Sequence, residues 1–583
     1  MSSEKRICKS CDVTFTIEPD DFSFYEKMGV PPPTWCPQCR LRRRLMWRND
    51  RDYYRRACDL CKRNIIALYP SDAPFPVRCV KCWWSDAWDP FQYGQRYDPS
   101  RPFFEQCNEI FEKIPAIAMQ NDDGVGSVNC EYTNDWWYSK NCYSAVAGWH
   151  DENVMYAAHI EHSKEIMDSL HVHHVEWLYE CLASTKCYRC AYCTFCHDCN
   201  DCFLSYDLRG CSNCVMCVGL RNKKYCILNQ QYSKEEYEVK LKELKLGSRT
   251  SIEKHRKTFE DFAKKFPRRY AQILKSVNAT GDMLINCKNT RDCYFNNSLE
   301  NCRFITIGDG GKETYDCLIT GQLELCYEGV VPDHSYHCMG TIYSVRSREV
   351  FYSWNCPGAE HLMGCAGIKK GSHVILNTQY TESEYETLKA KVVADMKRRG
   401  EWGEFFPESM SPFAYNETLA YDIAPLSRDE AIAQGFRWKE PRERDYKITL
   451  PAEKIPDTIA EVGDNITNEV IGCLHGGSCN EKCTTAFRIV PDELRFYRAM
   501  HIPPPQLCPN CRHYARIATR SPMRLWKRDC MCGTTNSKEQ RAYRNTAPHS
   551  HGEKPCPNEF ETTFAPNRTE IIYCEDCYNA EVA

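Results

Sequence analysis

Apolar residues return at intervals of 24 through the middle of the chain. One series comprises Cys130, Val154, Leu178, Cys202 and Cys226, and a second comprises Cys302, Cys326, Val350 and Val374. Most of them begin a short β-like run, such as Cys226-Ile-Leu and Val374-Ile-Leu. A second apolar frame lies nine residues earlier, which indicates two short strands per 24 residues. This period predicts a parallel β-solenoid with about 24 residues per rung.

The two halves of this middle region are copies of each other. Residues 217–233 match residues 365–381 at an offset of 148, including a shared Ile-Leu-Asn-x-Gln-Tyr segment. Each copy then leads into a capping box, Ser233-x-x-Glu236 or Thr381-x-x-Glu384, which predicts the start of a helix. We therefore expect two short solenoids, each followed by a helical insert.

The two ends of the chain carry a duplicated cysteine module. The N-terminal copy, residues 8–40, contains C-x-x-C, Phe-Tyr, Pro-Pro-Pro and C-P-x-C-R in that order. The C-terminal copy, residues 479–512, contains C-x3-C and then the same three motifs. Cys11 and Cys36 are 25 residues apart, and so are Cys483 and Cys508. Matching motifs at matching spacing indicate a duplication.

A second cysteine module follows each copy. The first has two C-x-x-C pairs, at residues 58–61 and 79–82, whereas the second ends in a single pair at residues 574–577. Cys556 precedes that last pair by 18 residues, the spacing that also separates the first two pairs, so one ligand is missing locally. Four residues could complete the last site: Cys530, Cys532, His549 and His551.

Paired C-x-x-C motifs of this spacing suit tetrahedral zinc, because each pair presents two thiolates from a tight turn. A shell of four thiolates has no open position, so such sites are expected to be structural rather than catalytic. The alternative is that these cysteines carry no metal and only pack. We predict three to four structural Zn²⁺ sites with these candidate ligands: Cys8, Cys11, Cys36, Cys39, Cys58, Cys61, Cys79, Cys82, Cys479, Cys483, Cys508, Cys511, Cys530, Cys532, Cys556, Cys574 and Cys577.

The order C-x-x-C, Phe-Tyr, C-P-x-C-R resembles the zinc-ribbon domain of uncharacterised bacterial cysteine-rich proteins. The resemblance covers about 40 residues at each end, and the layout of two ribbons around a cysteine-rich middle is similar to that family as well. The C-x3-C pair of Cys479 and Cys483 departs from the family spacing by one residue. The resemblance implies zinc, and it implies no activity.

Six cysteines of the middle region occur at every third residue: Cys187, Cys190, Cys193, Cys196, Cys199 and Cys202. Iron–sulfur is one interpretation, but the run lacks the x3 step and the proline of the bacterial ferredoxin motif. At the offset of 148 the same positions are Ser335, Cys338, Thr341, Ser344, Ser347 and Val350. This exchange favours small side chains packed in a tight interior, with extra zinc or copper, or an iron–sulfur cluster, as the remaining alternatives.

A cluster of histidines precedes the cysteine run: His150, His159, His162, His171, His173 and His174. These residues either form a metal or acid–base site or lie on exposed loops of the solenoid. The second half of the chain has no matching cluster, which favours the loop interpretation.

An arginine-rich stretch with interleaved aromatic residues follows the last cysteine of each ribbon. Guanidinium groups beside aromatic rings are typical of phosphate contacts combined with base stacking. The alternative is a solvated face, or arginines that pair with acidic neighbours. The predicted nucleic-acid-binding residues are Arg40, Arg42, Arg43, Arg44, Arg48, Arg512, Arg516, Arg520 and Arg524.

Composition narrows the function classes. The chain has 583 residues, 40 cysteines and a net charge of −4, which excludes a wholly basic nucleic-acid coat. It has no apolar run of about 18 residues and no apolar leader, so we expect no membrane span, no signal peptide and reduced thiols in the cytoplasm. It also has no Gly-rich phosphate loop, nucleophile elbow or H-E-x-x-H motif.

The predicted fold is mainly β and multidomain, with zinc ribbons at both termini flanking two short parallel β-solenoids. The predicted segments are 1–50, ribbon with basic helix; 51–100, second ribbon; 101–232, cysteine-rich solenoid; 233–285, helical insert; 286–380, second solenoid; 381–470, helix and aromatic wrapping segment; 471–528, ribbon with basic helix; and 529–583, fourth zinc module. The expected function is a non-catalytic zinc-binding scaffold that contacts nucleic acid or a ribonucleoprotein. The alternatives are a protein-assembly scaffold that uses the solenoid faces, and a metal-dependent redox or hydrolytic protein.

Overall fold

The chain folds into two compact units, each built from two separate stretches. The computed structural model describes residues 2–122, 124–173, 176–319, 321–440, 446–532, 543–552 and 554–582, with the backbone alone for 171–173 and 176–178. Unit 1 comprises Met1–Gln120 and Ile273–Glu440, and unit 2 comprises Asn121–Gln272 and Pro441–Ala583. The protein is multidomain and rich in strands, most of them in parallel sheets, as the sequence predicts.

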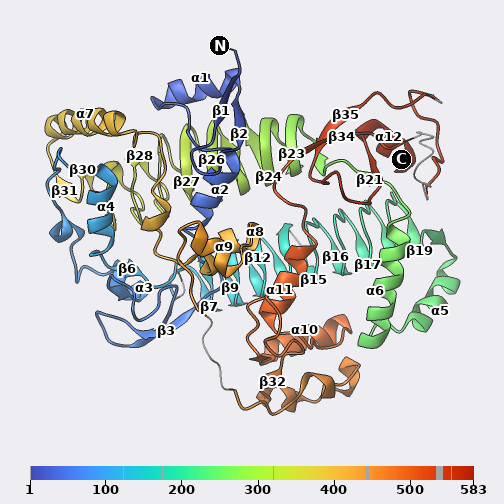
Figure 1. The fold of residues 1–583 in the computed structure, drawn as a ribbon. Coiled ribbons are helices and arrows are strands. Elements are labelled where there is room, and N and C mark those ends of the chain that lie inside the picture. Colours follow the sequence, from blue (N-terminus) through green and yellow to red (C-terminus); the bar gives the residue numbers. More distant parts are fainter. Residues whose placement is uncertain are drawn as a thin grey trace. The chain divides into compact units, whose positions relative to one another are not determined.

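Unit 2 contains a long row of short parallel strands, which Figure 1 shows side by side from β7 to β19. The strands are β7 (Val128–Glu131), β8 (Asn134–Trp137), β9 (Lys140–Tyr143), β10 (Val146–Trp149), β11 (Glu152–Met155), β12 (Ala158–Glu161), β13 (Lys164–Met167), β14 (Leu170–His173), β15 (Glu176–Tyr179), β16 (Tyr188–Ala191), β17 (Asn200–Phe203), β18 (Ser212–Val215) and β19 (Lys224–Ile227). They form two sheets, in the orders β14-β12-β10-β8 and β19-β18-β17-β16-β15-β13-β11-β9-β7. A final antiparallel strand, β20 (Gln230–Gln231), closes the second sheet.

Unit 1 contains a second row of parallel strands. They are β22 (Ile273–Leu274), β23 (Val277–Ile285), β24 (Lys288–Glu300), β25 (Thr306–Lys312), β26 (Thr314–Leu318), β27 (Cys326–Val330), β28 (Arg348–Phe351), β29 (Glu360–Met363) and β30 (Ser372–Ile375). The antiparallel strand β31 (Thr378–Gln379) ends this row as β20 ends the other. The two rows therefore finish in the same way, as expected for the duplicated sequence.

The strand register advances by twelve residues, not by 24. Cys202 pairs with Cys214, and Cys214 pairs with Cys226. In unit 1, Val350 pairs with Leu362, which pairs with Val374. The period of 24 seen in the sequence therefore spans two steps of the structure, because an apolar residue stands in the same place at every step.

The backbone turns at every third residue of both rows. Non-glycine residues with positive φ recur at intervals of three, for example Asn129, Tyr132, Asp135 and Tyr138 in unit 2. Each such turn is a single left-handed residue, a conformation that costs roughly 1 kcal/mol for a side chain with a Cβ. Turns this frequent shorten every straight run to about three residues, so the strands are short and closely spaced.

The residue after each left-handed turn points inward and is buried. In unit 2 these positions include Cys130, Thr133, Trp136 and Ser139, and each is less than one-twentieth exposed. All 13 cysteines between residues 130 and 226 fall in this single three-residue frame, and all of them are buried. The eight cysteines between residues 287 and 365 share a frame of their own and are buried too. The middle cysteines are thus interior residues of two narrow cores.

The thiols of these cores donate to backbone carbonyl groups in a fixed pattern. Cys196 Sγ donates to the carbonyl oxygens of Thr194 and Ser205, two residues before it and nine after it. Ser344, its counterpart at the offset of 148, donates through Oγ to the equivalent oxygens of Ile342 and Ser353. Burial raises the pKa of Cys302 and of Cys365 to about 12, which keeps these thiols protonated at neutral pH. The contacts agree with the packing interpretation of the cysteine run.

Helices follow each row of strands. In unit 2, α5 (Lys234–Leu244) and α6 (Arg249–Ala263) lie beyond β19 (Figure 1), and in unit 1 the long helix α7 (Glu382–Arg399) follows β31. Both predicted capping boxes are present, because the side chains of Ser233 and Thr381 accept from the backbone N–H groups of Glu236 and Glu384. Two shorter helices, α8 (Leu419–Ile423) and α9 (Arg428–Ala433), complete the second stretch of unit 1.

The chain ends form small hairpins and helices. In unit 1 these elements are β1 (Glu4–Ile7), β2 (Thr14–Ile17), α1 (Pro19–Met28), α2 (Pro37–Leu45), β3 (Tyr54–Ala57), β4 (Asn64–Ala67), β5 (Val77–Arg78), α3 (Val80–Trp84), α4 (Phe103–Phe111) and β6 (Ala116–Ile117). In unit 2 they are β32 (Ile471–Gly472), β33 (Ala486–Phe487), α10 (Pro491–Met500), α11 (Pro509–Ala518), β34 (Trp526–Asp529), β35 (Glu559–Thr562), β36 (Ile572–Tyr573) and α12 (Glu575–Val582). Strand β36 pairs with β21 (Arg268–Arg269), which follows α6 in the chain.

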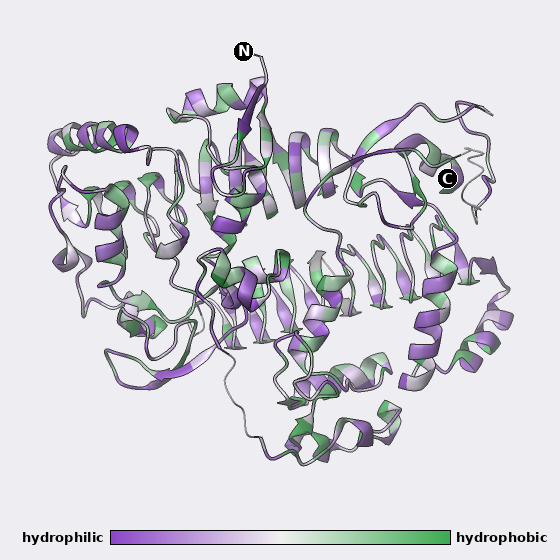
Figure 2. Cartoon of the chain, in the orientation of Figure 1, coloured by the Kyte–Doolittle hydropathy of each residue, from purple (hydrophilic) through white to green (hydrophobic). Residues whose placement is uncertain are grey.

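Hydrophobic and hydrophilic residues alternate over short distances along the strands and helices of both units, as Figure 2 shows. Along the two rows of strands this pattern follows from the three-residue frame, in which one residue points inward and its neighbours face outward. Among the helices of the described chain, none combines the length and the hydropathy that a membrane crossing requires.

The narrow core predicts a size limit at Cys196. We expect Cys196→Ser to change the free energy of unfolding by no more than about 1 kcal/mol, because Ser344 makes the same two hydrogen bonds in the other copy. Cys196→Leu should destabilise the protein by about 1–3 kcal/mol, because the core has no space for the added carbons. Chemical denaturation of both variants, with metal analysis, provides the measurement. If Cys196→Ser lowered the metal content, the packing interpretation would be wrong.

Candidate metal centres

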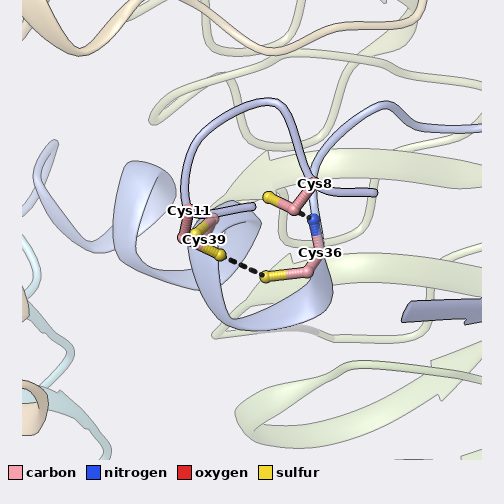
Figure 3. Close-up of side chains that lie close together, drawn as sticks. All are labelled: Cys8, Cys11, Cys36 and Cys39. Atoms are coloured by element: carbon pink, nitrogen blue, oxygen red, sulfur yellow. Dashed lines mark hydrogen bonds between the residues drawn. The ribbon is translucent and has the colours of Figure 1, made fainter. Parts of the chain in front are cut away.

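Four cysteines of the N-terminal ribbon converge in what we call site 1. Cys8 directly follows β1 and Cys11 lies in the turn that leads to β2, while Cys36 caps the N-terminus of α2 and Cys39 lies in its first turn. Figure 3 shows their sulfur atoms turned toward a common centre. All four lie within 4.8 Å of one another, and the Cys11 and Cys36 sulfurs are 3.7 Å apart.

One hydrogen bond is repeated at four such sites. At site 1 the backbone N–H of Cys36 donates to Cys8 Sγ over 3.1 Å, as drawn in Figure 3. The three equivalent bonds run from Cys79 to Cys58, from Cys508 to Cys473 and from Cys574 to Cys530, with lengths of 3.3, 3.3 and 3.2 Å. An N–H group aimed at sulfur favours the thiolate form, which is the form that binds metal. The repeated bond also identifies which cysteines are equivalent.

The spacing of the sulfur atoms fits a metal. All 40 cysteines carry free thiols. Sulfur–sulfur distances of 3.7 Å at site 1 and 4.0 Å at site 2 are far longer than a disulfide bond. They lie close to the roughly 3.8 Å edge of a tetrahedron with metal–sulfur bonds of about 2.3 Å. Four donors at this spacing can complete the shell of a tetrahedral ion.

Site 2 consists of Cys58, Cys61, Cys79 and Cys82. Cys58 follows β3, and Cys79 is the N-cap residue of α3. The sulfur atoms of Cys61 and Cys79 are 4.0 Å apart. The Arg63 guanidinium donates to Cys61 Sγ over 3.4 Å and lowers the pKa of that thiol to about 6. The arrangement therefore favours a thiolate at the most exposed member of the site.

Site 3 differs from the sequence prediction in one ligand. The set of four that converges is Cys473, Cys483, Cys508 and Cys511. Cys473 directly follows β32, just as Cys8 follows β1, so it takes the place that the sequence assigned to Cys479. Cys479 remains close, with its sulfur 3.7 Å from that of Cys511. The sequence does contain a sign of this ligand, because Cys473 follows the segment Val-Ile-Gly. The C-x-x-C spacing does not reveal it, because the turn from Cys473 to Cys483 is seven residues longer than the turn from Cys8 to Cys11.

Site 4 is completed by Cys530. Together with Cys556, Cys574 and Cys577 it forms a set whose sulfurs lie within 4.8 Å of one another. Cys530 follows β34 as Cys58 follows β3, which resolves the choice that the sequence left open. The other three candidates were Cys532, His549 and His551. His549 instead places Nε2 2.9 Å from an oxygen of Glu581, whereas Cys532 and His551 belong to a second set described below.

The arginines that follow site 1 are buried and paired with carboxylates. Arg40 Nη2 lies 2.9 Å from Asp316 Oδ2, and Arg44 Nη1 lies 3.0 Å from Asp316 Oδ1 and 2.7 Å from Glu328 Oε2. Arg43 Nη2 is 3.0 Å from Glu328 Oε1. The exposed fraction of each of these five side chains is 3% or less. The α2 helix is thus joined to β26 and β27 by buried ion pairs.

The C-terminal ribbon repeats this arrangement in unit 2. Arg512 Nε lies 2.8 Å from Asp168 Oδ2, and Arg516 Nη1 lies 3.0 Å from Asp168 Oδ1. Asp168 and Asp316 are separated by the duplication offset of 148, and Arg512 and Arg40 end the same C-P-x-C-R motif. The Phe-Tyr motif also packs on the strands, since Phe24 stacks on Tyr315 at 3.9 Å and Tyr497 contacts Tyr179. Each ribbon therefore uses its own motif residues to dock on one row of strands.

The remaining arginines of the predicted nucleic-acid interface differ in their exposure and in their partners. Arg48 is buried against Asp50, and Arg42 is half-buried beside Glu408. Arg520 is half-buried, while Arg524 is exposed and stacks on Trp526. Six of the predicted residues therefore pair with acidic side chains, as the alternative to phosphate contact supposed: Arg40, Arg43, Arg44, Arg48, Arg512 and Arg516. Burial leaves these six little surface for a phosphate, and nothing in the described residues supports nucleic-acid contact.

Part of the histidine cluster forms a stack. The rings of His150 and His162, one register step apart, lie 4.9 Å apart and nearly parallel, and Tyr138 stacks on His150. His361 and His373 form a similar pair in unit 1. His174 and the side chains of His171 and His173 lie outside the described residues. His150 and His162 are exposed, in agreement with the loop interpretation that the sequence favours.

Substitution of Cys473 or Cys479 tests which of the two cysteines is the fourth ligand of site 3. We expect Cys473→Ser to remove one metal ion per chain, because it deletes the sulfur that accepts the Cys508 N–H bond. Cys479→Ser is the matched control and should keep the full metal content. Inductively coupled plasma mass spectrometry of the purified variants measures this difference. Metal loss in Cys479→Ser alone would contradict the assignment.

Arg44 tests the role of the buried arginines. Arg44→Met should destabilise the protein by about 3–5 kcal/mol, because it leaves the buried Glu328 and Asp316 carboxylates short of a partner. The half-buried Arg42→Met should cost less than about 1 kcal/mol. Denaturant titration followed by tryptophan fluorescence gives both values. An Arg44→Met variant with unchanged stability but weakened RNA binding would restore the nucleic-acid interpretation.

No protein-family model matches the chain, and no curated protein or solved structure is significantly similar to it. The likeness to zinc ribbons therefore rests on the four-cysteine sets at both ends of the chain.

Proposed function

We propose that this protein is a non-catalytic scaffold whose ends are folded by structural zinc and fastened to two parallel β-solenoids. The observation that carries the proposal is the set of four closed cysteine shells, all with the same N–H to sulfur bond. Thiolate-only shells suit zinc, and they leave no position at which a substrate or water could bind the ion. The metal would thus act on folding and not on chemistry.

The solenoid part of the proposal rests on the register. Strands that pair at a constant step of twelve residues, with a turn at every third residue, are what a coil of four short sides per turn requires. Each turn of such a coil contacts only its neighbours, so its stability depends on covered ends. The helices α5 and α7, which contact the last parallel strands β19 and β30, would supply that cover at one end of each row.

Zinc would contribute directly to the stability of the ends. The hairpins of sites 1 to 4 have strands of only two to four residues, too short to fold by their own hydrophobic contacts. Structural zinc in small domains has an apparent binding free energy on the order of 10 kcal/mol, and this energy is available for folding. Once a ribbon is ordered, its arginines are held in place to meet Asp316 or Asp168.

Protein partners suit the exposed faces better than nucleic acid does. The outer surface carries ladders of polar side chains one register step apart, such as Asn129 to Asn141 and Asn141 to Asn153, joined by amide hydrogen bonds of about 3 Å. Unit 1 has a corresponding ladder that includes Asn289 and Asn301. Repeated surfaces of this kind are the binding surfaces of solenoid proteins. Of the nine arginines predicted to contact nucleic acid, only Arg42, Arg520 and Arg524 are not buried.

Removal of zinc is expected to unfold the ends before the middle. Chelation at neutral pH should lower the melting temperature and make residues 1–100 and 471–583 sensitive to protease, because the hairpins of the four sites lose their metal. The parallel strands should retain their circular dichroism. Replacing the four cysteines of site 1 by serine should reproduce the N-terminal part of this effect alone. A metal-free protein with unchanged melting and proteolysis would refute the proposal.

A further inference from the structure

Site 4 contains more metal-binding atoms than one tetrahedral ion can use. Besides the set already described, which includes Cys530 and Cys574, a second set of four donors lies within 4.8 Å of one another: Cys532, His551, Cys556 and Cys577. Cys556 and Cys577 belong to both sets, and their sulfurs are 3.8 Å apart. Six donors therefore compete for the four positions around one ion, and two of the six are common to both arrangements.

Cys532 is in direct contact with the first set. Its Sγ lies 3.4 Å from Cys530 Sγ and 3.2 Å from Cys577 Sγ. Both distances are shorter than the roughly 3.8 Å edge of a thiolate tetrahedron, so these sulfurs suit neighbouring positions around a single ion. The distances also define a third complete set, in which Cys532 takes the place of Cys574 beside Cys530, Cys556 and Cys577.

His551 is oriented as a metal ligand. Its Nδ1 lies 2.6 Å from the backbone carbonyl oxygen of Lys554, which can only accept, so Nδ1 carries the proton. The lone pair is then on Nε2, which lies 3.2 Å from Cys532 Sγ and 3.5 Å from Cys577 Sγ. Metal-bound histidines commonly hold their second nitrogen in this way against a carbonyl. His551 and Cys556 are half-buried, so the site is accessible from the solvent on this side.

Site 2 lacks the additional thiol. The backbone N–H bonds to sulfur make Cys530 the counterpart of Cys58. Two residues further along the chain, site 4 has Cys532, whereas site 2 has Leu60. A leucine side chain has no donor atom for a metal, so this position cannot replace a ligand that site 2 loses. The two sites therefore form a matched pair that differs in its spare donor.

We propose that site 4 binds one divalent, thiol-preferring ion such as zinc and exchanges the ligands around it. The two shared thiolates stay bound throughout. Cys532 first replaces Cys574, and His551 then replaces Cys530. An ion whose ligands leave one at a time is open to outside thiols as well, so site 4 is where the chain exchanges metal with them. The inference rests on the proposed metal loading of the ends.

Each step balances in atoms and charge. In the first, the metal–Cys574 bond breaks as the metal–Cys532 bond forms, and the proton of the entering thiol passes to the departing thiolate. In the second, the neutral imidazole of His551 enters, and the departing Cys530 thiolate takes up one proton from the solvent. A zinc ion can expand to five ligands for a short time, so the entering donor can bind before the other leaves.

Metal counting by inductively coupled plasma mass spectrometry tests the exchange. The zinc-loaded wild-type protein should contain four ions per chain, one at each of sites 1 to 4. Cys574→Ser should retain four, because Cys532 completes the third set. Cys79→Ser is the matched variant at site 2 and should reduce the number to three. The double variant Cys574→Ser/Cys532→Ala should also contain three, because the spare thiol is gone.

The contrary outcomes are distinct. A wild-type protein with four ions and a Cys574→Ser variant with three would overturn the ligand exchange and leave the proposed function intact. A double variant that retains four ions would also overturn it, because the replacement would then not depend on Cys532. A wild-type protein without bound metal would refute both proposals.

Isotope exchange tests the same inference without removing a ligand of the first set. When the zinc-loaded protein is mixed with isotopically labelled zinc and a small thiol, one of the four ions should exchange faster than the other three. Cys532→Ala should abolish this fast phase, because no second thiol can then enter the shell. Leu60→Ala, at the counterpart position of site 2, should leave it unchanged. A single rate for all four ions, or a fast phase that survives Cys532→Ala, would overturn the proposal.

Discussion

A left-handed residue at every third position is the constraint on which both rows of strands depend. It limits each straight segment to about three residues and brings one residue in three to an interior that is only a few side chains wide. Cysteine suits that interior because it is small and apolar, and its thiol can still donate to the carbonyl groups that the turns leave inside. Serine meets the same requirement, because Ser344, the counterpart of Cys196 in the second sequence copy, makes the equivalent hydrogen bond. The high cysteine content of the middle is therefore a consequence of backbone geometry.

The same geometry explains why the ends need arginine, and why a bound metal would help to place it. The strands place Asp316 and Glu328 side by side, one register step apart, under a ribbon that buries both. Buried carboxylates would be costly without partners, and Arg40, Arg43 and Arg44 supply them. Those guanidinium groups reach the carboxylates only if α2 is held at a defined angle, and α2 begins at Cys36, a member of site 1. Metal binding at site 1 would therefore be coupled to ion pairing, since without the metal the ion pairs would lack a rigid support.

Sequence reasoning could find what depends on local spacing. The gaps between the cysteine pairs, 25 residues at sites 1 and 3 and 18 at site 2, were enough to locate these sites. The capping boxes at Ser233 and Thr381 were enough to predict the starts of two helices. Cys473 was missed because its hairpin tolerates a longer turn without moving its ends, so spacing alone cannot reveal it. The step of twelve was read as 24 because neighbouring steps differ in residue type while sharing apolar character. The sequence left ion pairing of the arginines open as an alternative but could not identify the partners, because the partner of Arg40 lies 276 residues away.

That long separation has a consequence for the order of folding. The cysteines of site 1 lie within about 30 residues of each other, so the site can close soon after its segment is made. The ion pair of Arg40 cannot form before Asp316 has been synthesised. In unit 2 the ion pair of Asp168 cannot form before Arg512, near the end of the chain, has been synthesised. Until then, one ribbon exposes arginines and one row of strands exposes a carboxylate, each of which is later buried. A ribbon already closed around metal would keep its arginines in a fixed arrangement during that interval. The closed metal shell thus serves the docking step, because a preformed helix loses less conformational entropy on binding than a disordered one.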